Sequence, residues 1–540
     1  MQRLLLLGDE AIAQAAIDAG LSGVFSYPGT PSTEITEYIR SSREARQKGI
    51  VARWCANEKT AAEAALGMSY AGRRAMTCMK HVGLNVAADL FMNSSITGAN
   101  GGMIFVVADD PSMHSSQNEQ DSRYYGKFAM MPVLEPGNQQ EAYDMVHYGF
   151  DFSEKFGIPV MIRITTRLAH SRAGVLRKPL VEQNSMKLPE NSSQFILLPS
   201  IARKQYQHLL DIQALFVEQS EKSSFNKYIE GPDKSKGIIA CGLAYNYLIE
   251  NFEGAKVPYP VLHLTQYPLP EKMIRKIYDE CDSLLVLEDG YPIVEEMLKG
   301  FLNLGKPITG RLDGTVKRTG ELTPTVVAVG LGFKQDKLLE VPTLVAPRPP
   351  SMCKGCPHID SFLGLNEALE HHGPGRVFSD IGCYTLSALP PYNSINTCVD
   401  MGASITMAKG AADAGLFPAV AVIGDSTFTH SGMTGLLDAV NDKSNITVII
   451  LDNATTGMTG GQPSSAFGRI EEICKGLGVE EDHIRVIKPI PKNLQENIQL
   501  MKEELEYPGV SVIIPRRECV VTFNQRMREK RKEKEKESNE

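Results

Sequence analysis

The stretch AVAVIGDSTFTHSGMTGLLDAVNDKSNITVIILDN (419–453) decides the fold, because it contains a complete strand–helix–strand unit. Its two apolar ends are predicted to be buried parallel strands, and the amphipathic middle is predicted to be the connecting helix. The first strand runs straight into Asp425, and the second runs into Asn453, 453 − 425 = 28 residues later. Open α/β sheets bind ligands at the carboxyl ends of their strands, so both side chains are expected at a binding site.

The residue types after these strands suit a hard cation. Magnesium prefers oxygen ligands in octahedral geometry. The Asp425 carboxylate, the Asn453 amide oxygen and the backbone carbonyl of Thr455 would supply three of them, and diphosphate oxygens would supply others. The alternative is an ordinary Asp at a strand end and an ordinary Asn in a turn. The strand–helix–strand context favours the cation site.

The same strand–helix alternation extends through most of the chain. It predicts an α/β fold with three doubly wound domains, which we expect at 1–195, 236–345 and 352–525. A polar, Lys/Gln/Ser-rich stretch at 196–235 is predicted to be a linker, partly helical. The mixed-charge tail at 526–540 is predicted to be a frayed, solvated end.

Composition excludes several classes of protein. The 540 residues are 42% hydrophobic and suffice for three or four domains without disulfides. The net charge of −8 argues against a nucleic-acid partner. Apolar runs are strand-sized and too short for a membrane span, and the start is too short for a signal peptide. Ten scattered cysteines do not resemble a secreted scaffold, so we expect a cytoplasmic protein.

Four cysteines stand out by their spacing. Cys353 and Cys356 form a CxxC, Cys383 follows 383 − 356 = 27 residues later, and Cys519 lies far downstream. The first three, with His358, would make a zinc site, since a CxxC indicates metal or redox chemistry. The remaining cysteines show no matching spacing and are predicted to be small buried side chains. They are Cys55, Cys78, Cys241, Cys281, Cys398 and Cys474.

Several motifs together carry a family resemblance that covers nearly the whole chain. They are YPGTPSTEI (27–35), NEKTAAEAALGMSYAGRRAMTCMKHVGLN (57–85), CKGCPH (353–358) and the run from Gly424 to TGGQPS (459–464). The chain resembles the 2-oxoacid:ferredoxin oxidoreductase family, and within it the indolepyruvate ferredoxin oxidoreductase alpha subunits. The resemblance implies a pyrimidine-binding domain at 1–195, a transketolase C-terminal-like domain at 236–345 and a diphosphate-binding domain at 352–525.

The resemblance also implies thiamine diphosphate and Mg²⁺ as cofactors and assigns residues to them. Glu58 would stand against the aminopyrimidine ring and share a proton with it, although a solvated Glu in a first helical turn is the alternative. Thr30 and His81 would lie near the reacting carbon, with Lys80 and Asn85 in the same cleft. The cofactor-binding residues implied are Gly424, Asp425, Ser426, His430, Asn453, Thr455, Gly457 and Met458, of which Asp425, Asn453 and Thr455 would hold Mg²⁺.

Two positions depart from the general thiamine motif. Ser426 replaces its third glycine, and Ala454 replaces a frequent second asparagine. Both substitutions resemble those of the indolepyruvate subfamily. The apolar Met458 suits a roomy pocket that accepts an aryl group better than a small pyruvate pocket.

The resemblance gives the cysteines a second interpretation. Cys353, Cys356, Cys383 and Cys519 resemble the layout that holds a 4Fe–4S cluster near thiamine. The sequence holds no CxxCxxCxxxCP run, so a ferredoxin or a separate ferredoxin-like subunit is expected to accept the electrons. A smaller beta (gamma-type) subunit is expected as a further partner, in an α2β2 assembly.

The implied reaction is oxidative decarboxylation of an arylpyruvate with coenzyme A. An alternative is a non-oxidative thiamine-dependent decarboxylase or carboligase, and a third is a scaffold subunit without activity. The cysteine quartet argues against the second interpretation. The presence of Glu58, Asp425 and Asn453 argues against the third.

Overall fold

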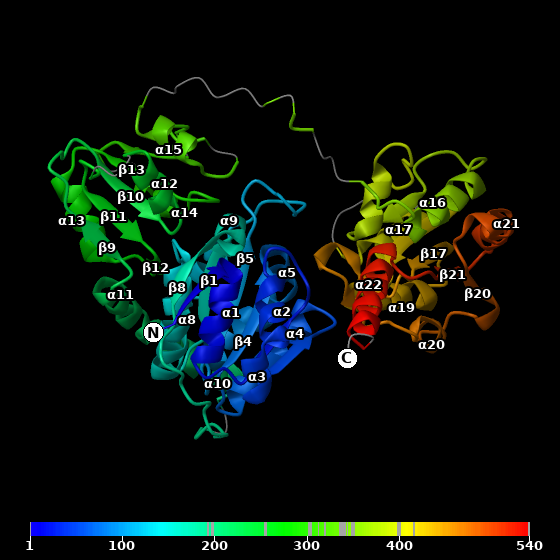
Figure 1. Ribbon diagram of the computed structural model, residues 1–540, viewed down its shortest axis with the longest axis horizontal. Coiled ribbons are helices and arrows are strands. Elements are labelled where there is room, and N and C mark those ends of the chain that lie inside the picture. Colours follow the sequence, from blue (N-terminus) through cyan, green and yellow to red (C-terminus); the bar gives the residue numbers. More distant parts are fainter. Residues whose placement is uncertain are drawn as a thin grey trace. The chain divides into compact units, whose positions relative to one another are not determined.

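The chain forms two compact units, Met1–Glu340 and Val341–Glu540, which are described separately (Figure 1). The computed structural model describes residues 2–191, 194–195, 199–252, 256–300, 305–311, 313–317, 320–333, 342, 344–346, 351–396, 401–413 and 416–537. Within these ranges, we find no helix whose length and hydropathy would suit a membrane span.

A largely parallel sheet of seven strands forms the centre of the first unit. Its order is β12-β6-β7-β5-β4-β2-β3, and the β12–β6 pair is antiparallel. The strands are β2 (Gly23–Ser26), β3 (Val51–Trp54), β4 (Ala75–Lys80), β5 (Met103–Asp109), β6 (Val133–Leu134), β7 (Val160–Thr165) and β12 (Gln266–Tyr267). Beside it, β1 (Arg3–Leu7) pairs antiparallel with β8 (Arg172–Leu176).

Both faces of this sheet are covered, which explains why most side chains of its strands are apolar. Along β5, Ile104 and Val106 belong to one hydrophobic core, and Phe105 and Val107 belong to another. The helices of this part are α1 (Gly8–Asp18), α2 (Thr33–Ser41), α3 (Arg43–Gln47), α4 (Glu58–Tyr70), α5 (His81–Val86), α6 (Ala88–Thr97), α7 (Arg123–Phe128), α8 (Gln139–Phe156) and α9 (Thr166–His170). The predicted doubly wound architecture is confirmed here.

A second sheet of the first unit has the order β14-β13-β10-β11-β9. Its parallel strands are β10 (Gly237–Cys241), β11 (Val261–Leu264), β13 (Leu284–Leu287) and β14 (Ile308–Thr309), and β9 (Lys227–Ile229) joins antiparallel at the edge. Its helices are α12 (Ala244–Glu250), α13 (Glu271–Glu280), α14 (Ile293–Lys299) and α15 (Pro324–Gly330). This sheet and the seven-stranded sheet belong to one compact unit.

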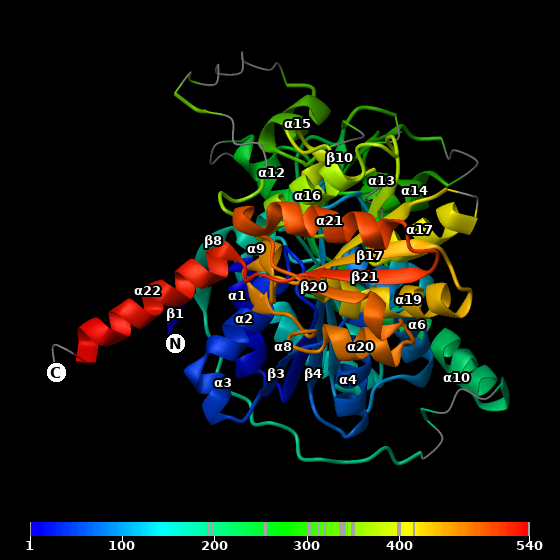
Figure 2. The same cartoon turned by 90° about the vertical axis from the view of Figure 1, so that its right-hand side faces the viewer.

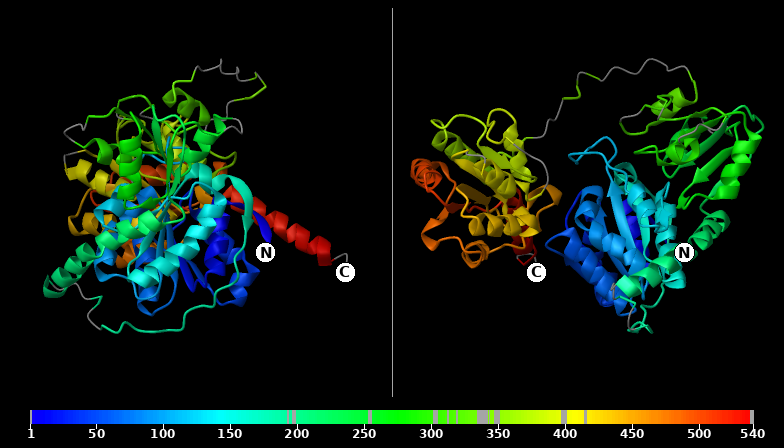
Figure 3. Two further views of the ribbon diagram at one scale, coloured as in Figure 1. Left: turned by 90° about the vertical axis from the view of Figure 1, so that its left-hand side faces the viewer. Right: turned by 180° about the vertical axis from the view of Figure 1, so that it is seen from behind.

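The stretch 196–235 is more structured than the predicted linker. It contains α10 (Pro199–Asp211), α11 (Gln213–Lys222) and the edge strand β9. Leu209 and Phe216 on these helices are almost fully buried, so apolar side chains spaced within a polar stretch anchor the segment. Before it, residues 177–191 run in extended form along the first unit (Figure 3), where the Val181 amide donates to the Asp18 carbonyl.

The second unit contains a five-stranded parallel sheet of order β15-β16-β17-β21-β20. The strands are β15 (Val377–Ser379), β16 (Ala419–Gly424), β17 (Ile446–Leu451), β20 (Ile484–Ile487) and β21 (Val510–Pro515). Its main helices are α16 (Pro357–Ala368), α17 (Ala403–Asp413), α18 (Asp425–Thr427), α19 (Met433–Asn441), α20 (Ile470–Gly476) and α21 (Leu494–Leu505). Val420 and Val422 of β16 face one core, and Ala421 and Ile423 face another.

The sequence predicted a frayed end for the charged tail, but the structure shows an ordered helix there. The tail forms helix α22 (Val520–Glu537), which projects from its own unit (Figure 2). Glu, Lys and Arg are strong helix formers, and this propensity decides the conformation of a segment that lacks a core of its own.

Candidate active site

The decisive stretch folds as predicted and brings its two polar ends together. Strands β16 and β17 are adjacent and parallel, with Gly424 paired in register with Leu451. Asp425 follows β16, and Asn453 lies two residues beyond β17. Their exposed fractions are only 2% and 7%. The two side chains therefore occupy neighbouring strand ends in a buried setting.

The surroundings of Asp425 fit a cation. Its Oδ1 accepts a hydrogen bond of 2.8 Å from the Ser426 amide, whereas its buried Oδ2 has no hydrogen-bond partner among the described residues. Burial, and then the charge of Asp452, raise the pKa of Asp425 to about 7. A buried carboxylate oxygen without a donor is costly unless a cation or a proton satisfies it. Asp425 and Asn453 thus fit a magnesium site with hard oxygen ligands.

The loop after Asn453 is held in a defined shape. Ala454 has a left-handed backbone, with φ of 63°, and the Thr455 amide donates to Asn453 Oδ1 at 3.1 Å. β18 (Thr455–Thr456) pairs with β19 (Gln462–Pro463) in a short hairpin. The Thr456 and Ser426 hydroxyls are 3.0 Å apart, which connects this loop to the turn after Asp425.

Met458 and His430, two of the predicted cofactor-binding residues, lie in this loop and just after the turn at Asp425. Met458 lies in the 3-10 turn η3 (Gly457–Thr459), and 64% of its surface is exposed. His430 lies in a π-helical turn, η2 (Phe428–Gly432), and is buried beside the Ser431 hydroxyl. Such π turns occur often at functional sites.

Sequence reasoning missed the involvement of His358 with Asn453. His358 is fully buried, and its Nε2 accepts a hydrogen bond of 3.1 Å from the Asn453 amide nitrogen. Burial lowers the pKa of His358 to about 4, so the ring is neutral and accepts this bond at pH 7. The position of His358 directly after the two cysteines and a proline was the one sequence signal for it. That signal led only to the interpretation of His358 as a zinc ligand.

Asp380 is a second buried carboxylate that the sequence did not mark. Burial raises its pKa to about 7. Its Oδ2 accepts hydrogen bonds from the Ser404 hydroxyl, at 2.5 Å, and from the Gly402 amide, at 3.2 Å. Its Oδ1 accepts one from the Tyr384 hydroxyl. Asp380 therefore connects the segment after β15 to the start of α17.

The four singled-out cysteines lie close enough to act on one another. The pKa of Cys356 is raised to about 11, first by burial and then by Cys353 and Cys519. The pKa of Cys383 is raised to about 12 by burial and by the other three thiols. A Cβ added at Gly457 would lie 2.9 Å from the Cys383 sulfur, so this thiol touches the loop after Asn453.

Among the described residues, no three of these sulfur atoms lie within 4.8 Å of one another, so the four thiols are neighbours but do not form a closed metal site. This set of soft donors suits iron or zinc. Of the other cysteines, Cys78, Cys241, Cys281 and Cys474 are buried as predicted, and Cys55 is half-buried. Cys398 lies outside the described residues.

Glu58 lies in the first unit, at the first position of α4. It is 5% exposed, so the alternative of a solvated Glu is wrong. A Cβ added at Gly83 would lie 2.5 Å from Glu58 Oε1, which means that α5 approaches this carboxylate closely only because residue 83 is glycine. The Asn57 side chain caps α4 by accepting from the Thr60 amide at 2.8 Å.

Lys80 lies between Glu58 and the turn that contains Thr30. Its side chain lies against Gly29, next to Thr30, and Glu58 and Asp110 are the negative charges that act on it. Burial nevertheless lowers the pKa of Lys80. Its ammonium donates to the Ser115 carbonyl at 3.0 Å, and the Ser115 hydroxyl reaches the Thr30 carbonyl at 3.4 Å.

His81 and Asn85 follow on α5. His81 is buried, with Nε2 3.2 Å from the Asn118 carbonyl and with no partner for Nδ1 among the described residues. Asn85 is exposed and accepts a hydrogen bond of 2.6 Å from the Tyr125 hydroxyl. Glu58, Thr30, Lys80 and His81 therefore share one region of the first unit.

Family models match both regions. Residues 14–202 match "Pyruvate flavodoxin/ferredoxin oxidoreductase, thiamine diP-bdg", and residues 380–514 match "Thiamine pyrophosphate enzyme, C-terminal TPP binding domain". A solved 2-oxoglutarate:ferredoxin oxidoreductase from Magnetococcus marinus shares the fold, with a TM-score of 0.51 over 61% of this chain and 65% of that one, at 15% identity. The fold and the matched domains define a thiamine-diphosphate-dependent 2-oxoacid oxidoreductase.

Sequence relatives show to which family within this class of oxidoreductases the chain belongs. The chain is 39% identical to the indolepyruvate oxidoreductase subunit IorA of Pyrococcus abyssi, over 96% of this chain and 86% of that protein. It is 38% identical to the IorA subunit of Archaeoglobus fulgidus, over 98% and 88% of the two chains. The chain belongs to the indolepyruvate oxidoreductase IorA family.

Proposed function

We propose that this chain catalyses the oxidative decarboxylation of arylpyruvates of the indolepyruvate type, with coenzyme A as the acyl acceptor. The products are the aryl-acetyl thioester, carbon dioxide, one proton and two electrons. The observation that carries the oxidative part is the group of four interacting thiols beside the loop that follows Asn453. The relatives named indolepyruvate oxidoreductase support the substrate class.

In this proposal the second unit holds the diphosphate of a thiamine diphosphate, and the first unit holds the aminopyrimidine ring of a thiamine diphosphate. The bound cofactor supplies the nucleophilic carbon and the electron sink that 2-oxoacid decarboxylation requires. Asp425, Asn453 and the Thr455 carbonyl hold Mg²⁺ against the diphosphate, with Gly424, Ser426, His430, Gly457 and Met458 around it. The buried carboxyl group of Glu58 holds a proton at the aminopyrimidine ring.

The remaining residues of the first unit orient the substrate. The half-buried Lys80 ammonium is a cation of this region and attracts the carboxylate of the 2-oxoacid. Thr30 and His81 place hydrogen-bonding groups near the keto oxygen. The exposed Met458 leaves room for an aryl group.

Cys353, Cys356, Cys383 and Cys519 would hold one 4Fe–4S cluster, which would supply one-electron transfer when bound. A ferredoxin or a ferredoxin-like subunit receives the electrons, and a smaller beta subunit completes an α2β2 complex. Ligation would ionise these thiols, because metal-bound sulfur is deprotonated.

The test is metal and absorbance analysis of the complex purified without oxygen. We expect about four irons per chain and a broad band near 400 nm that indolepyruvate bleaches. Cys383→Ser should lose the iron and the band, whereas Cys55→Ser, which alters a half-buried thiol outside the quartet, should keep both. A colourless but fully active protein would instead indicate a non-oxidative decarboxylase.

Substrate preference is tested on the same material. Indolepyruvate should reduce the cluster faster than pyruvate does at equal concentration. Equal rates for the two acids would contradict the arylpyruvate assignment and leave the oxidative reaction standing.

A further inference from the structure

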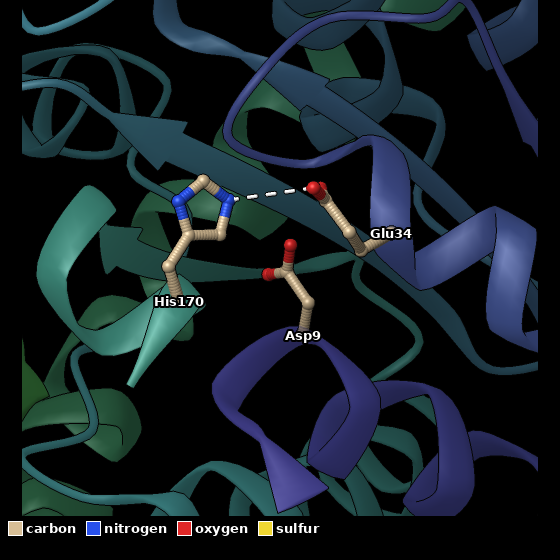
Figure 4. Close-up of side chains that lie close together, drawn as sticks. All are labelled: Asp9, Glu34 and His170. Atoms are coloured by element: carbon tan, nitrogen blue, oxygen red, sulfur yellow. Dashed lines mark ion pairs between the residues drawn. The ribbon is translucent and has the colours of Figure 1, made fainter. Parts of the chain in front are cut away.

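Three side chains outside the proposed thiamine site converge in the first unit (Figure 4). Asp9 is at the start of α1, Glu34 is in the first turn of α2, and His170 ends α9. One ligand atom from each lies within 4.8 Å of the other two. The three residues come from separate segments of the chain, so tertiary folding rather than local sequence brings them together.

Asp9 is the unusual member of this group. Its side chain is completely buried, and neither carboxylate oxygen has a hydrogen-bond partner among the described residues. Its carboxylate points toward Glu34 and His170 (Figure 4). Glu34 Oε2 is also buried without a partner. Three carboxylate oxygens therefore lack donors in one small space.

The local charges do not balance Asp9. After burial, the negative charge of Glu34, the approach of the Glu34 carboxylate within hydrogen-bonding reach and the charge of Glu10 all raise the pKa of Asp9. His170 faces Glu34, with Nε2 3.6 Å from Oε1, which is longer than a normal hydrogen bond. A charged group buried beside like charges needs a positive partner or a proton.

We propose that Asp9, Glu34 and His170 bind one divalent first-row transition metal ion of the Zn²⁺ type. Two carboxylate oxygens and one imidazole nitrogen are a common three-ligand set for such an ion, and water would complete the coordination. The Glu34 and His170 side chains are 37% and 36% exposed, so the ion can enter from solvent. Mg²⁺ suits the all-oxygen site at Asp425 better, because it accepts imidazole poorly.

The bound ion would brace the turn that carries Thr30. The Thr33 hydroxyl, next to Glu34, accepts a hydrogen bond of 3.0 Å from the Gly29 amide. The Ser32 hydroxyl donates to the Gly29 carbonyl at 2.8 Å. Fixing Glu34 to α1 and α9 therefore fixes the start of α2 and the turn before it. The site is structural, and it does not depend on the proposed substrate.

The experiment measures zinc content and thermal stability of the intact complex, in excess thiamine diphosphate and Mg²⁺. After incubation with Zn²⁺ and desalting, the wild type should retain about one more zinc per chain than Asp9→Asn or His170→Gln. Zn²⁺ should also raise the melting temperature of the wild type and leave both variants unchanged. Glu37→Gln, an exposed change on α2, should behave like the wild type.

Zinc bound at other places should be equal in the wild type and in the variants. The difference in zinc content between them therefore measures binding at this site. His170→Gln alters a partly exposed side chain and serves if Asp9→Asn does not fold. Equal zinc content in the wild type and His170→Gln, with no melting shift in either, would overturn the proposal. That result would mean that a proton shared between Asp9 and Glu34 satisfies the pair.

Discussion

At the scale of single residues, buried carboxylates hold most of the chemistry of the second unit. Asp380 and Asp425 are both buried, and the pKa of each is raised to about 7, but their surroundings differ. Asp380 has hydrogen-bond donors on both oxygens, whereas Asp425 Oδ2 has none among the described residues. Asp380 is therefore satisfied by the protein itself, and Asp425 requires an added cation or proton.

This difference predicts a pH dependence of magnesium binding. Since the pKa of Asp425 lies near 7 instead of near 4, the carboxylate holds a proton at pH 6 that Mg²⁺ must displace. Mg²⁺ affinity in the presence of thiamine diphosphate should fall about tenfold per pH unit below pH 7 and level off above pH 8. Calorimetric titrations from pH 5.5 to 8.5 measure it, with Mg²⁺ binding to free thiamine diphosphate as the reference. A flat profile after subtraction would contradict this protonation state.

At the scale of elements, the strands were the most predictable part of the molecule. The strand–helix alternation predicted for 1–195 forms a doubly wound sheet, because continuous apolar runs between helices are typical of such sheets. The decisive stretch also folds as expected. The stretch 196–235 is partly helical as predicted, in α10 and α11, whereas the charged tail was expected to fray and instead forms α22.

The site was predictable where strand ends define it and less so elsewhere. The neighbouring positions of Asp425 and Asn453 could be predicted from the strand–helix–strand pattern alone, whereas the role expected for Glu58 came from the family resemblance. His358 and Asp380 act through contacts across the fold, with Asn453 and with Ser404, and neither contact leaves a local sequence pattern. The group of Asp9, Glu34 and His170 is spread over 161 residues (170 − 9) and has no motif at all.

The close approach of α5 to α4 gives a prediction about Glu58. In Gly83→Ala the new methyl group would meet the Glu58 carboxylate at 2.5 Å and push it aside. We expect activity to fall by about 10²-fold or more, because small displacements of a catalytic group are costly, with the cluster absorbance retained. Gly67→Ala, in the middle of α4 with open space around its Cβ, is the matched control. Full activity in Gly83→Ala would exclude a catalytic position for Glu58.

At the scale of the whole first unit, a buried ion network joins the two sheets. Arg163 on β7 is fully buried, and its guanidinium contacts Asp109 at 2.7 Å and Glu135 at 2.5 Å. The same group donates to the Asp289 carbonyl at 2.7 Å, just after β13 of the other sheet. Arg123 makes a similar connection, from Asp121 to the Tyr291 carbonyl. These contacts explain why the two sheets form one compact unit.

Removing one guanidinium should therefore weaken both sheets together. Arg163→Met removes the cation between Asp109 and Glu135, and Asp109 then keeps only the Ser122 amide as a donor, so the free energy of unfolding of the first unit should fall by about 3–5 kcal/mol. Arg172→Met removes a side chain that is 57% exposed, and it should change stability by less than about 1 kcal/mol. Denaturant unfolding followed by hydrogen exchange measures this, and amides of β5 and of β10 should lose protection to the same extent. Loss of protection confined to β5 would mean that the sheets unfold independently and that the network contributes within one sheet alone.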